Sequence, residues 1–404
     1  MSPGRTSASL DSRSLEPLLA AKEIVVFCGS GGVGKTSVAA AAALTAATRL
    51  GGRVLVLTID PARRLASALG LDGIGNVERR VPAEALKAAG IEARGELWTA
   101  MLDTKQSWDD LVASHAPDEE TAYRILENRL YHNITARFVQ SHDYIAMERL
   151  YEIHATGTYD LIVIDTPPTR NALDFLEAPR RMADFFGGRL LRWLTMPYRV
   201  GGRRGARVIN VASRPFYQVA DRILGSQFLQ DIAEFFLNFQ SMYAGFVTRA
   251  KAVERLLHDK RTTFGVVTTL EAAPLREAEY FCEQLQDRGF HLGALVLNKT
   301  LPAYLLSPEG DRAALLLAAE TGPIAEALAA LDAPALAEPE RTARVLRTVG
   351  ESFLNFAVVA KREAELRAEL ARAPEVIADV PNFDADIYDL AGLARIGEHL
   401  FPTG

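Results

Sequence analysis

The chain has 404 residues, of which 49% are hydrophobic, so it can hold two or three domains or one large domain with an insertion. Its 45 basic and 51 acidic side chains give a net charge of −6, which argues against a general electrostatic surface for nucleic acid or anionic membranes. The two cysteines, Cys28 and Cys282, exclude a disulfide framework and a Cys-x-x-Cys metal site within one chain, and favour a cytoplasmic location.

The N-terminal residues 1–20 are predicted to form a disordered tail. Met1 to Leu19 is polar, rich in serine and arginine, and lacks the apolar centre of a signal peptide. No apolar run elsewhere is long enough to cross a bilayer. We therefore expect the folded chain to begin near residue 21 and to have no membrane span.

A phosphate-binding loop is predicted at residues 29–37, because Gly29 to Thr36 has the spacing Gly-x-x-x-x-Gly-Lys-Thr. Glycines there let backbone N–H groups turn toward phosphates, while Lys35 reaches the β/γ oxygens and the Thr36 hydroxyl reaches Mg²⁺. A short apolar strand over 24–27 precedes the loop, and an alanine-rich helix over 37–49 follows with its N-terminus facing the anion. The predicted nucleotide-binding residues are Gly29, Ser30, Gly31, Gly32, Val33, Gly34, Lys35, Thr36 and Ser37.

A carboxylate, Asp60, follows the second apolar strand at residues 54–59. In open α/β sheets ligands collect outside the carboxyl ends of strands, which would place Asp60 where it orients an attacking water or touches the Mg²⁺ shell. Aspartate is also a common cap of a helix, and a helix is expected to start near Pro61. The residues alone leave both roles open.

The middle of the chain is predicted to be helical on both sides of one strand. A mixed connection over 71–95 and a short strand at 97–102 lead into helices over 104–157, where apolar residues recur at three- and four-residue spacing. The strand at 159–165 ends in Asp165, the Walker B arrangement that holds Mg²⁺ through its water shell. The segment Thr166-Pro167-Pro168-Thr169 is expected to sense the γ-phosphate.

A second helical region, at 180–261, carries a broad apolar face between Val219 and Val247. Such a face cannot be left in water. It is either core beneath the rest of this region or part of a groove for an apolar client helix. The sequence does not decide between these readings.

The sheet is predicted to resume with strands at 263–268 and 292–297, the second of which ends in Asn298. An asparagine there can read a nucleobase edge, and the absence of an aspartate at position 301 argues against the Asn-Lys-x-Asp pattern of guanine recognition. We therefore expect adenine. Helices over 313–333 and 340–371, a strand at 375–380 and a last helix complete the chain, with Pro381 and Phe383 expected to wall the base.

The predicted fold class is α/β, with a doubly wound, mostly parallel sheet of the P-loop NTPase type and an inserted α-helical subdomain. Nucleotide-binding segments are expected at 21–103, 158–179 and 262–404, with a helical insertion at 104–157 and a helical subdomain at 180–261.

The order of these motifs resembles the deviant Walker A ATPases of the arsenite-translocating and tail-anchored-protein-targeting family, from about Ala21 onward. The resemblance implies ATP and Mg²⁺ as cofactors and a dimer that sandwiches ATP. It implies that Asp60 activates water as the first switch, that Asp165 and Thr166 begin the second switch, and that Asn298 contacts adenine. Thr36, Asp60 and Asp165 are then the Mg²⁺ residues, partly through water, and Asp60 and Lys35 are catalytic.

Three departures from that family stand out. Ser30 occupies the position of a lysine that in the family reaches the partner subunit's nucleotide and stabilises charge in the transition state. Arg170-Asn171-Ala172 stands where the second switch commonly has Gly-His-Thr. The family's zinc-bridging cysteine pair and its arsenite-binding cysteine triad are both missing, which disfavours arsenite chemistry through thiolates.

The missing positive charge has two candidate sources. Arg63 or Arg64, beside Asp60, would supply it within the chain, or a paralogous subunit with an intact lysine would supply it across a heterodimer. The arginines can equally be solvated surface charges.

Three function classes follow from the sequence. The first is a dimeric ATP-hydrolysing switch protein, a homodimer or a heterodimer, whose helical subdomain docks a hydrophobic client or a membrane-protein helix. The second is a catalytically weak regulatory subunit of a paralogous ATPase, and the third is a small-substrate P-loop kinase. The switch segments suit a sensor of nucleotide state better than they suit a kinase.

Overall fold

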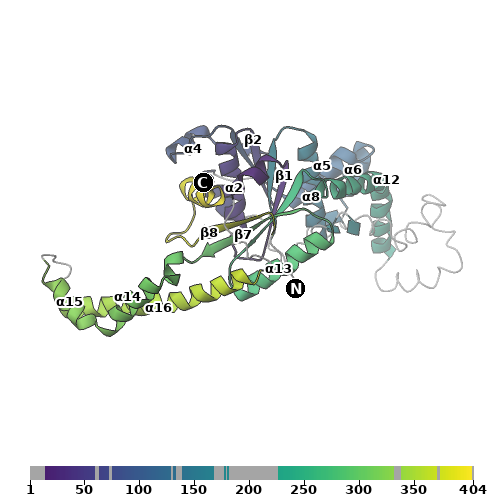
Figure 1. The fold of residues 1–404 in the computed structure, drawn as a ribbon. Coiled ribbons are helices and arrows are strands. Elements are labelled where there is room, and N and C mark those ends of the chain that lie inside the picture. Colours follow the sequence, from purple (N-terminus) through teal and green to yellow (C-terminus); the bar gives the residue numbers. More distant parts are fainter. Residues whose placement is uncertain are drawn as a thin grey trace, which may run out of the picture.

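A computed structural model describes residues 14–59, 63–71, 75–128, 131–132, 139–167, 177–178, 180–181, 226–331, 338–370 and 374–402. Its centre is an eight-stranded sheet with the order β3-β4-β2-β5-β1-β6-β7-β8 (Figure 1). All pairings are parallel except that of the edge strand β3 with β4. The strands are β1 (Ile24–Cys28), β2 (Arg53–Thr58), β3 (Arg79–Arg80), β4 (Glu96–Met101), β5 (Leu161–Asp165), β6 (Thr262–Thr268), β7 (Leu292–Thr300) and β8 (Val376–Pro381).

Helices cover both faces of the sheet, as a doubly wound fold requires. One face carries α1 (Glu16–Ala20), α2 (Lys35–Arg49), α3 (Arg63–Ala68), α4 (Ala83–Ala88) and α17 (Leu390–Leu400). The other carries α5 (Thr104–His115), α6 (Glu119–Leu126), α8 (Val139–Ala155), α12 (Ser226–Leu257) and α13 (Ala272–Asp287). The predicted α/β class with a mostly parallel sheet is therefore confirmed.

Alanine allows α2 to lie between the sheet and another helix. Its residues Ala39–Ala43 are all buried, and small side chains permit close approach on both sides. On the outer side, Thr45 of α2 lies so close to Gly397 of α17 that a Cβ atom at Gly397 would meet the Thr45 hydroxyl at 1.9 Å. The helix that follows the phosphate loop is thus fixed from two sides.

The N-terminal segment differs from the prediction of a disordered tail over residues 1–20. Residues 16–20 form α1, and Leu15 and Leu19 are buried, because these apolar side chains pack beside α2. The Leu15 N–H also donates to the carbonyl of Leu400 in α17 at 2.9 Å. The prediction was wrong for residues 14–20, while residues 1–13 lie outside the described part of the chain.

Two predicted elements differ in detail. The mixed connection over 71–95 contains β3 and α4, which are too short to show a hydrophobic period. The single helix expected over 313–333 is two helices, α14 (Pro308–Ala319) and α15 (Thr321–Ala329). Pro323 lacks the N–H that a continuous helix would use, so it fits the first turn of a new helix instead.

Part of the apolar face of the second helical region is core. Phe235, Phe239, Met242 and Phe246 of α12 are 2–3% exposed. The rings of Phe239 and Phe246 stack at 5.1 Å, and both contact Trp108 of α5. These contacts support the core interpretation for Phe235, Phe239, Met242 and Phe246, whereas Val247 is half-buried and residues 219–225 lie outside the described part of the chain.

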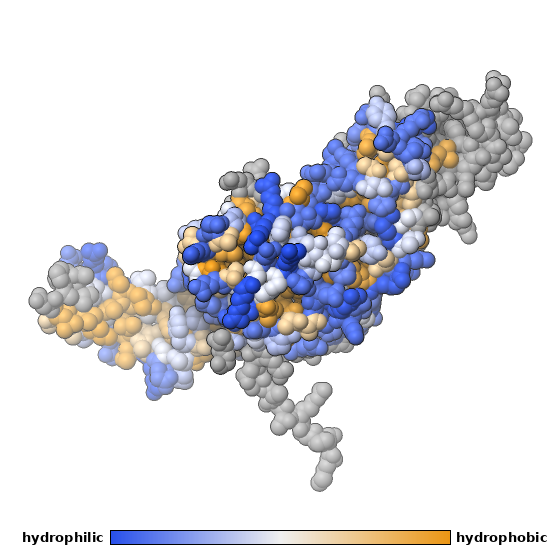
Figure 2. Space-filling model, turned by 90° about the horizontal axis from the view of Figure 1, so that it is seen from above, coloured by the Kyte–Doolittle hydropathy of each residue, from blue (hydrophilic) through white to orange (hydrophobic). Residues whose placement is uncertain are grey.

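A helical arm projects from the sheet (Figure 1). It consists of a 3₁₀ turn (Ala303–Leu306), α14, α15 and α16 (Pro339–Ala368). Gly350 brings α16 against α14, since a Cβ atom there would lie 2.6 Å from the carbonyl oxygen of Ala314. Hydrophobic side chains gather on the visible face of the arm (Figure 2), and Val349 and Phe356 of α16 are 51% and 54% exposed. Among the described residues, no helix is long and apolar enough to cross a membrane.

Candidate functional site

The loop between β1 and α2 has the backbone conformation that its glycines predict. Gly29 has φ +154° and Gly34 has φ +90°, both in the region that L side chains rarely adopt. A Cβ atom at Gly29 would meet the Val267 carbonyl oxygen at 2.1 Å, and one at Gly34 would meet the Asn298 side-chain nitrogen at 2.3 Å. Both positions therefore require glycine for space as well as for conformation.

Positive electrostatic potential converges on the loop from the start of α2. Gly34 is the N-cap residue of α2, and no side chain caps this end of the helix, so its first N–H groups face the loop. Lys35 is 6% exposed and its Nζ donates to the carbonyl of Ser30 at 2.9 Å. The lysine therefore lies across the loop, where a phosphate bound by the N–H groups would meet its ammonium group.

Oxygen ligands suited to Mg²⁺ meet beside the first turn of α2. The Thr36 hydroxyl donates to Asp165 Oδ2 at 2.7 Å, and the Thr58 hydroxyl donates to the same oxygen at 3.1 Å. Asp165 is 1% exposed and ends β5, the strand next to β1 in the sheet. A hydroxyl and a carboxylate are ligands that Mg²⁺ prefers, so these residues fit the ion.

Part of the predicted switch machinery is described. Thr166 follows Asp165 and is held at the end of β1, because its hydroxyl donates to the Phe27 carbonyl at 2.8 Å. Asp60 lies outside the described residues, as do Pro168 and Thr169. Arg63 and Arg64 are the first two residues of α3, the helix that follows β2 in the chain.

Ser30, the residue at the lysine position of the resembled family, contacts a carboxylate. Its hydroxyl donates to Glu277 Oε2 of α13 at 2.6 Å. The sequence gives no signal for this contact, because Glu277 is far from the loop in the chain and belongs to an otherwise ordinary amphipathic helix. The structure therefore adds Glu277 to the candidate site.

The end of β7 also contacts the loop. Asn298 is 6% exposed and its Nδ2 donates to the Val33 carbonyl at 2.7 Å, while Lys299 Nζ donates to the Gly32 carbonyl at 3.2 Å. Asn298 was a predicted site residue, and Lys299 was missed although it is the next residue along. Because the Asn298 amide NH₂ group donates to the loop, the side-chain carbonyl oxygen of Asn298 is left to accept hydrogen bonds from other donors.

Pro381 and Phe383 were both predicted to wall the nucleobase, and the structure places Pro381 beside β7 and Phe383 against α17. Pro381 ends β8 and pairs in register with Thr300 of β7, next to the Asn298 segment. The Phe383 ring lies under the Arg395 guanidinium at 4.7 Å and 5.8 Å from the His399 ring, both on α17. Pro381 thus adjoins the site, whereas contact of Phe383 with a base is a prediction only.

The thiol of Cys28, just before the loop, is not reactive. Cys28 ends β1 and is 1% exposed, and burial raises the pKa of its thiol to about 12. A hydrogen bond with Thr166 and the charge of Lys35 act in the opposite direction and are outweighed. Because only a thiolate is a good nucleophile, Cys28 is a core residue of this site.

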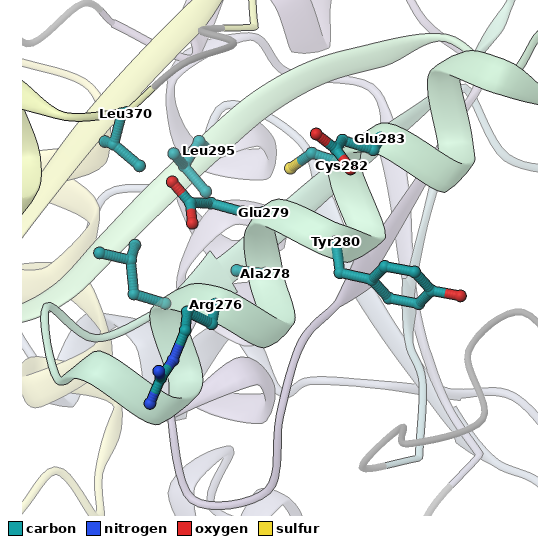
Figure 3. Close-up of a pocket in the computed structure, with 9 residues that line it drawn as sticks. Arg276, Ala278, Glu279, Tyr280, Cys282, Glu283, Leu295 and Leu370 are labelled. Atoms are coloured by element: carbon teal, nitrogen blue, oxygen red, sulfur yellow. The ribbon is translucent and has the colours of Figure 1, made fainter.

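A separate hollow of about 280 Å³ lies along α13 (Figure 3). Leu275, Leu295 and Leu370 form its apolar walls, and Glu279 and Cys282 line it as well. Burial raises the pKa of the Cys282 thiol to about 12, with nearby acidic groups adding to the effect. The hollow therefore offers neither a reactive thiol nor a phosphate-binding loop. The candidate functional residues lie at the loop between β1 and α2 instead.

The strand–loop–helix unit, the buried carboxylate of β5 and the parallel sheet together define a P-loop nucleotide-binding protein of the α/β class. The chain belongs to the anion-transporting ATPase family, whose sequence model matches residues 22–309. This membership confirms the resemblance to the anion-transporting ATPases, while the deviant Walker A assignment and its lysine position stay predictions.

Individual relatives show how far the similarity extends. The chain is 29% identical over 282 residues to "Uncharacterized protein SCO2128" of Streptomyces coelicolor, covering 69% of this chain and 62% of that protein. It is 23% identical over 303 residues to "Putative arsenical pump-driving ATPase 1" of Aquifex aeolicus, with shares of 71% and 65%. It is 23% identical over 294 residues to "Putative ATPase Mb3704" of Mycobacterium bovis, with shares of 69% and 65%. The chain thus spans less than two thirds of the length of these relatives.

Proposed function

We propose that this protein binds ATP with Mg²⁺ and hydrolyses it to ADP and phosphate, acting as a nucleotide-dependent switch. The observation that carries the proposal is the hydrogen bond of 2.7 Å between Thr36 at the start of α2 and the buried Asp165 at the end of β5. It joins the phosphate loop to a carboxylate that suits Mg²⁺. Membership in the anion-transporting ATPase family supports the same activity.

Each described site residue has a distinct role in this proposal. The loop N–H groups and the open N-terminus of α2 bind the phosphates, and Lys35 neutralises charge that develops on the β/γ oxygens. Thr36 and Asp165 hold Mg²⁺, which draws charge from the phosphate oxygens when bound. Asp60 is the proposed group that orients the attacking water. Asn298 is the proposed contact to adenine.

Slow or partner-dependent turnover is part of the proposal, because Ser30 brings no cation to the loop. Its hydroxyl donates to Glu277, so the Ser30 side chain holds a carboxylate at the position where the family has a cation, and Lys35, which donates to the Ser30 carbonyl, is the cation of this loop. A negative group beside the phosphates disfavours the additional charge of the transition state. We therefore propose a dimer, either of two copies or with a paralogous ATPase that supplies a lysine. A catalytically weak regulatory subunit is the alternative.

Docking of a hydrophobic client or partner is a further part of the proposal, with the cytoplasm as its setting. The buried side chains of α12 between Phe235 and Phe246 do not offer a groove. Exposed apolar side chains lie instead on the arm, including Val349 and Phe356, and such surfaces commonly mark interaction sites.

Phosphate release from Mg-ATP by the purified chain tests the hydrolytic proposal. Lys35→Ala and Asp165→Asn should lower turnover at least about a hundredfold, since Lys35 would neutralise charge on the phosphoryl oxygens and Asp165 would hold the Mg²⁺ that does the same. Lys87→Ala, at an exposed position of α4, is the matched control and should leave turnover unchanged. Variants at Arg63 and Arg64 that keep full turnover would exclude a rescue within the chain.

The alternatives give different results in the same assay. ATP binding without phosphate release, reversed by adding a paralogous ATPase, would favour the regulatory subunit. Incubation with radiolabelled ATP and cell extract separates the kinase class, because a kinase yields a labelled small product in place of free phosphate. Ser30→Lys should raise the turnover of the isolated chain if the missing cation limits it.

A further inference from the structure

The end of β7 has an unusual backbone at Lys299. Asn298 pairs with Val380 of β8 and Thr300 pairs with Pro381, so Lys299 is an extra residue between two consecutive pairs. Its φ is +58°, and among the described residues it is the one non-glycine residue with positive φ. A lysine in this conformation is disfavoured sterically, and such strain is found preferentially at functional sites.

The bulge has a geometrical consequence for two adjacent side chains. In a regular strand, consecutive side chains point to opposite faces of the sheet, so neighbours cannot both reach one loop. Here Asn298 reaches the Val33 carbonyl at 2.7 Å and Lys299 reaches the Gly32 carbonyl at 3.2 Å. The extra residue redirects the lysine side chain, which is a known effect of β-bulges.

The two contacts fix the direction of the loop's N–H groups. A peptide unit is planar and trans, so the carbonyl of Gly32 and the N–H of Val33 point in opposite directions. The same relation links the carbonyl of Val33 to the N–H of Gly34. Holding both carbonyls on the β7 side therefore turns both N–H groups toward the opposite side, where the loop receives phosphate.

We propose that Lys299 is a positioning residue for the nucleotide, which orients the Val33 N–H through its bond to the Gly32 carbonyl. Its ammonium group also adds positive charge beside Gly32, in a loop that has Ser30 in place of the family lysine. This inference rests on the proposed nucleotide-binding function and assigns a further residue to the same site. The strained backbone at Lys299 is the structural condition for that contact.

Three variants separate positioning from a purely structural role. Lys299→Met keeps the length of the side chain and removes the charge and the donor, Lys299→Arg keeps both, and Lys299→Gly removes the anchor and also relieves the positive φ. Lys87→Met on α4 is the control for loss of one exposed lysine. ATP affinity is measured by competition with a fluorescent nucleotide in Mg²⁺, and stability is measured by urea unfolding of the nucleotide-free chain.

Lys299→Met should weaken ATP binding by about five- to tenfold, the effect of one charge-assisted hydrogen bond, while Lys299→Arg stays within about twofold of wild type. Lys299→Gly should weaken binding similarly without lowering the urea midpoint, because relief of strain offsets the lost contact. Hydrogen exchange at the Val33 amide in the nucleotide-free chain should be faster in Lys299→Met.

The outcomes distinguish this inference from the proposed function. If the wild-type chain binds ATP and Lys299→Met binds it equally well with unchanged exchange at Val33, the positioning role is wrong while nucleotide binding stands. Parallel losses of affinity and stability in Lys299→Gly would overturn it as well, since they indicate a structural residue. If the wild-type chain does not bind ATP, the proposed function itself is overturned, and the exchange result alone decides whether Lys299 orients the loop.

Discussion

Replacement of Gly34 by alanine tests the link between the phosphate loop and Asn298. The new Cβ atom would lie 2.3 Å from Asn298 Nδ2, so the amide must move away from the Val33 carbonyl that it now contacts at 2.7 Å. Asn298 is 6% exposed, which means that the separated groups lose their partner without gaining full access to water. Gly34→Ala therefore carries two separate penalties.

The two penalties can be estimated. Alanine at the positive φ of Gly34 costs about 1–2 kcal/mol in backbone strain. Loss of the buried hydrogen bond between Asn298 and Val33 costs about 1–3 kcal/mol more. Gly34→Ala should thus lower the free energy of unfolding by about 2–5 kcal/mol. With Asn298→Ala already present, the side chain is gone and only the strain of about 1–2 kcal/mol should be left.

Urea unfolding of the nucleotide-free chain in a double-mutant cycle measures this difference. Gly32→Ala is the matched control, because Gly32 has φ +81° and no atom within 4 Å of a new Cβ. It should cost about 1–2 kcal/mol whether residue 298 is asparagine or alanine. An equal cost of Gly34→Ala in both backgrounds would refute the reasoning, because the clash with Asn298 would then contribute nothing.

Two further predictions concern buried groups. Arg249 pairs with Glu148, which is 1% exposed, so Arg249→Met should lower the free energy of unfolding by about 3–5 kcal/mol, against under about 0.5 kcal/mol for Arg255→Met on the exposed side of α12. Burial raises the pKa of Glu148 and the charge of Arg249 opposes that rise, so removing Arg249 raises the folded-state pKa further above that of the unfolded chain. The deficit relative to wild type should therefore grow as pH rises above 4.5; a deficit that shrinks would contradict this. Burial raises the pKa of the Cys28 and Cys282 thiols to about 12. Iodoacetamide at pH 8 should therefore modify both cysteines in urea and neither in the native chain, as measured by mass spectrometry. Rapid labelling of Cys28 in the native chain would contradict its burial beneath the loop at residues 29–37.

The geometry of the candidate site could be predicted largely from local chemistry. The spacing of Gly29 to Thr36 imposes its own loop geometry, and parallel strands bring Asp165 and Asn298 to the same edge of the sheet once the strands are recognised. These contacts depend on residues at the ends of strong apolar strands, which are the clearest elements in the sequence.

Residues that join the site through tertiary packing could not be predicted. Glu277 meets Ser30 because α13 follows β6, which lies beside β1, and no local pattern indicates that one surface glutamate faces the loop. Lys299 was visible beside Asn298, but the bulge that directs it to Gly32 depends on the pairing of β7 with β8. Such contacts depend on the register between strands that are distant in the chain.

Composition gave a wrong prediction of disorder for residues 14–20 for a related reason. The first residues are polar enough to predict disorder, yet a few leucines suffice to anchor α1 once α2 and α17 provide an apolar surface. Helices were predicted over 313–333 and 340–371, where the structure has α14, α15 and α16, but helices that pack on each other and helices that pack on the sheet have the same period. The direction of the arm follows from packing and not from propensity.

Within the described residues, the arm is attached to the sheet at one end, close to the proposed nucleotide. Glu363 of α16 accepts a hydrogen bond from the Leu301 N–H at 3.2 Å, and Arg367 pairs with Asp379 of β8 at 2.8 Å. From Glu363 back to its first residue, Pro339, α16 extends about 36 Å at 1.5 Å per residue. A tilt of about 5° at the attachment would displace the far end by about 3 Å. A small rearrangement at the attached end, beside Asn298, would therefore produce its largest displacement at the far end of the arm, beyond the residues that match the family.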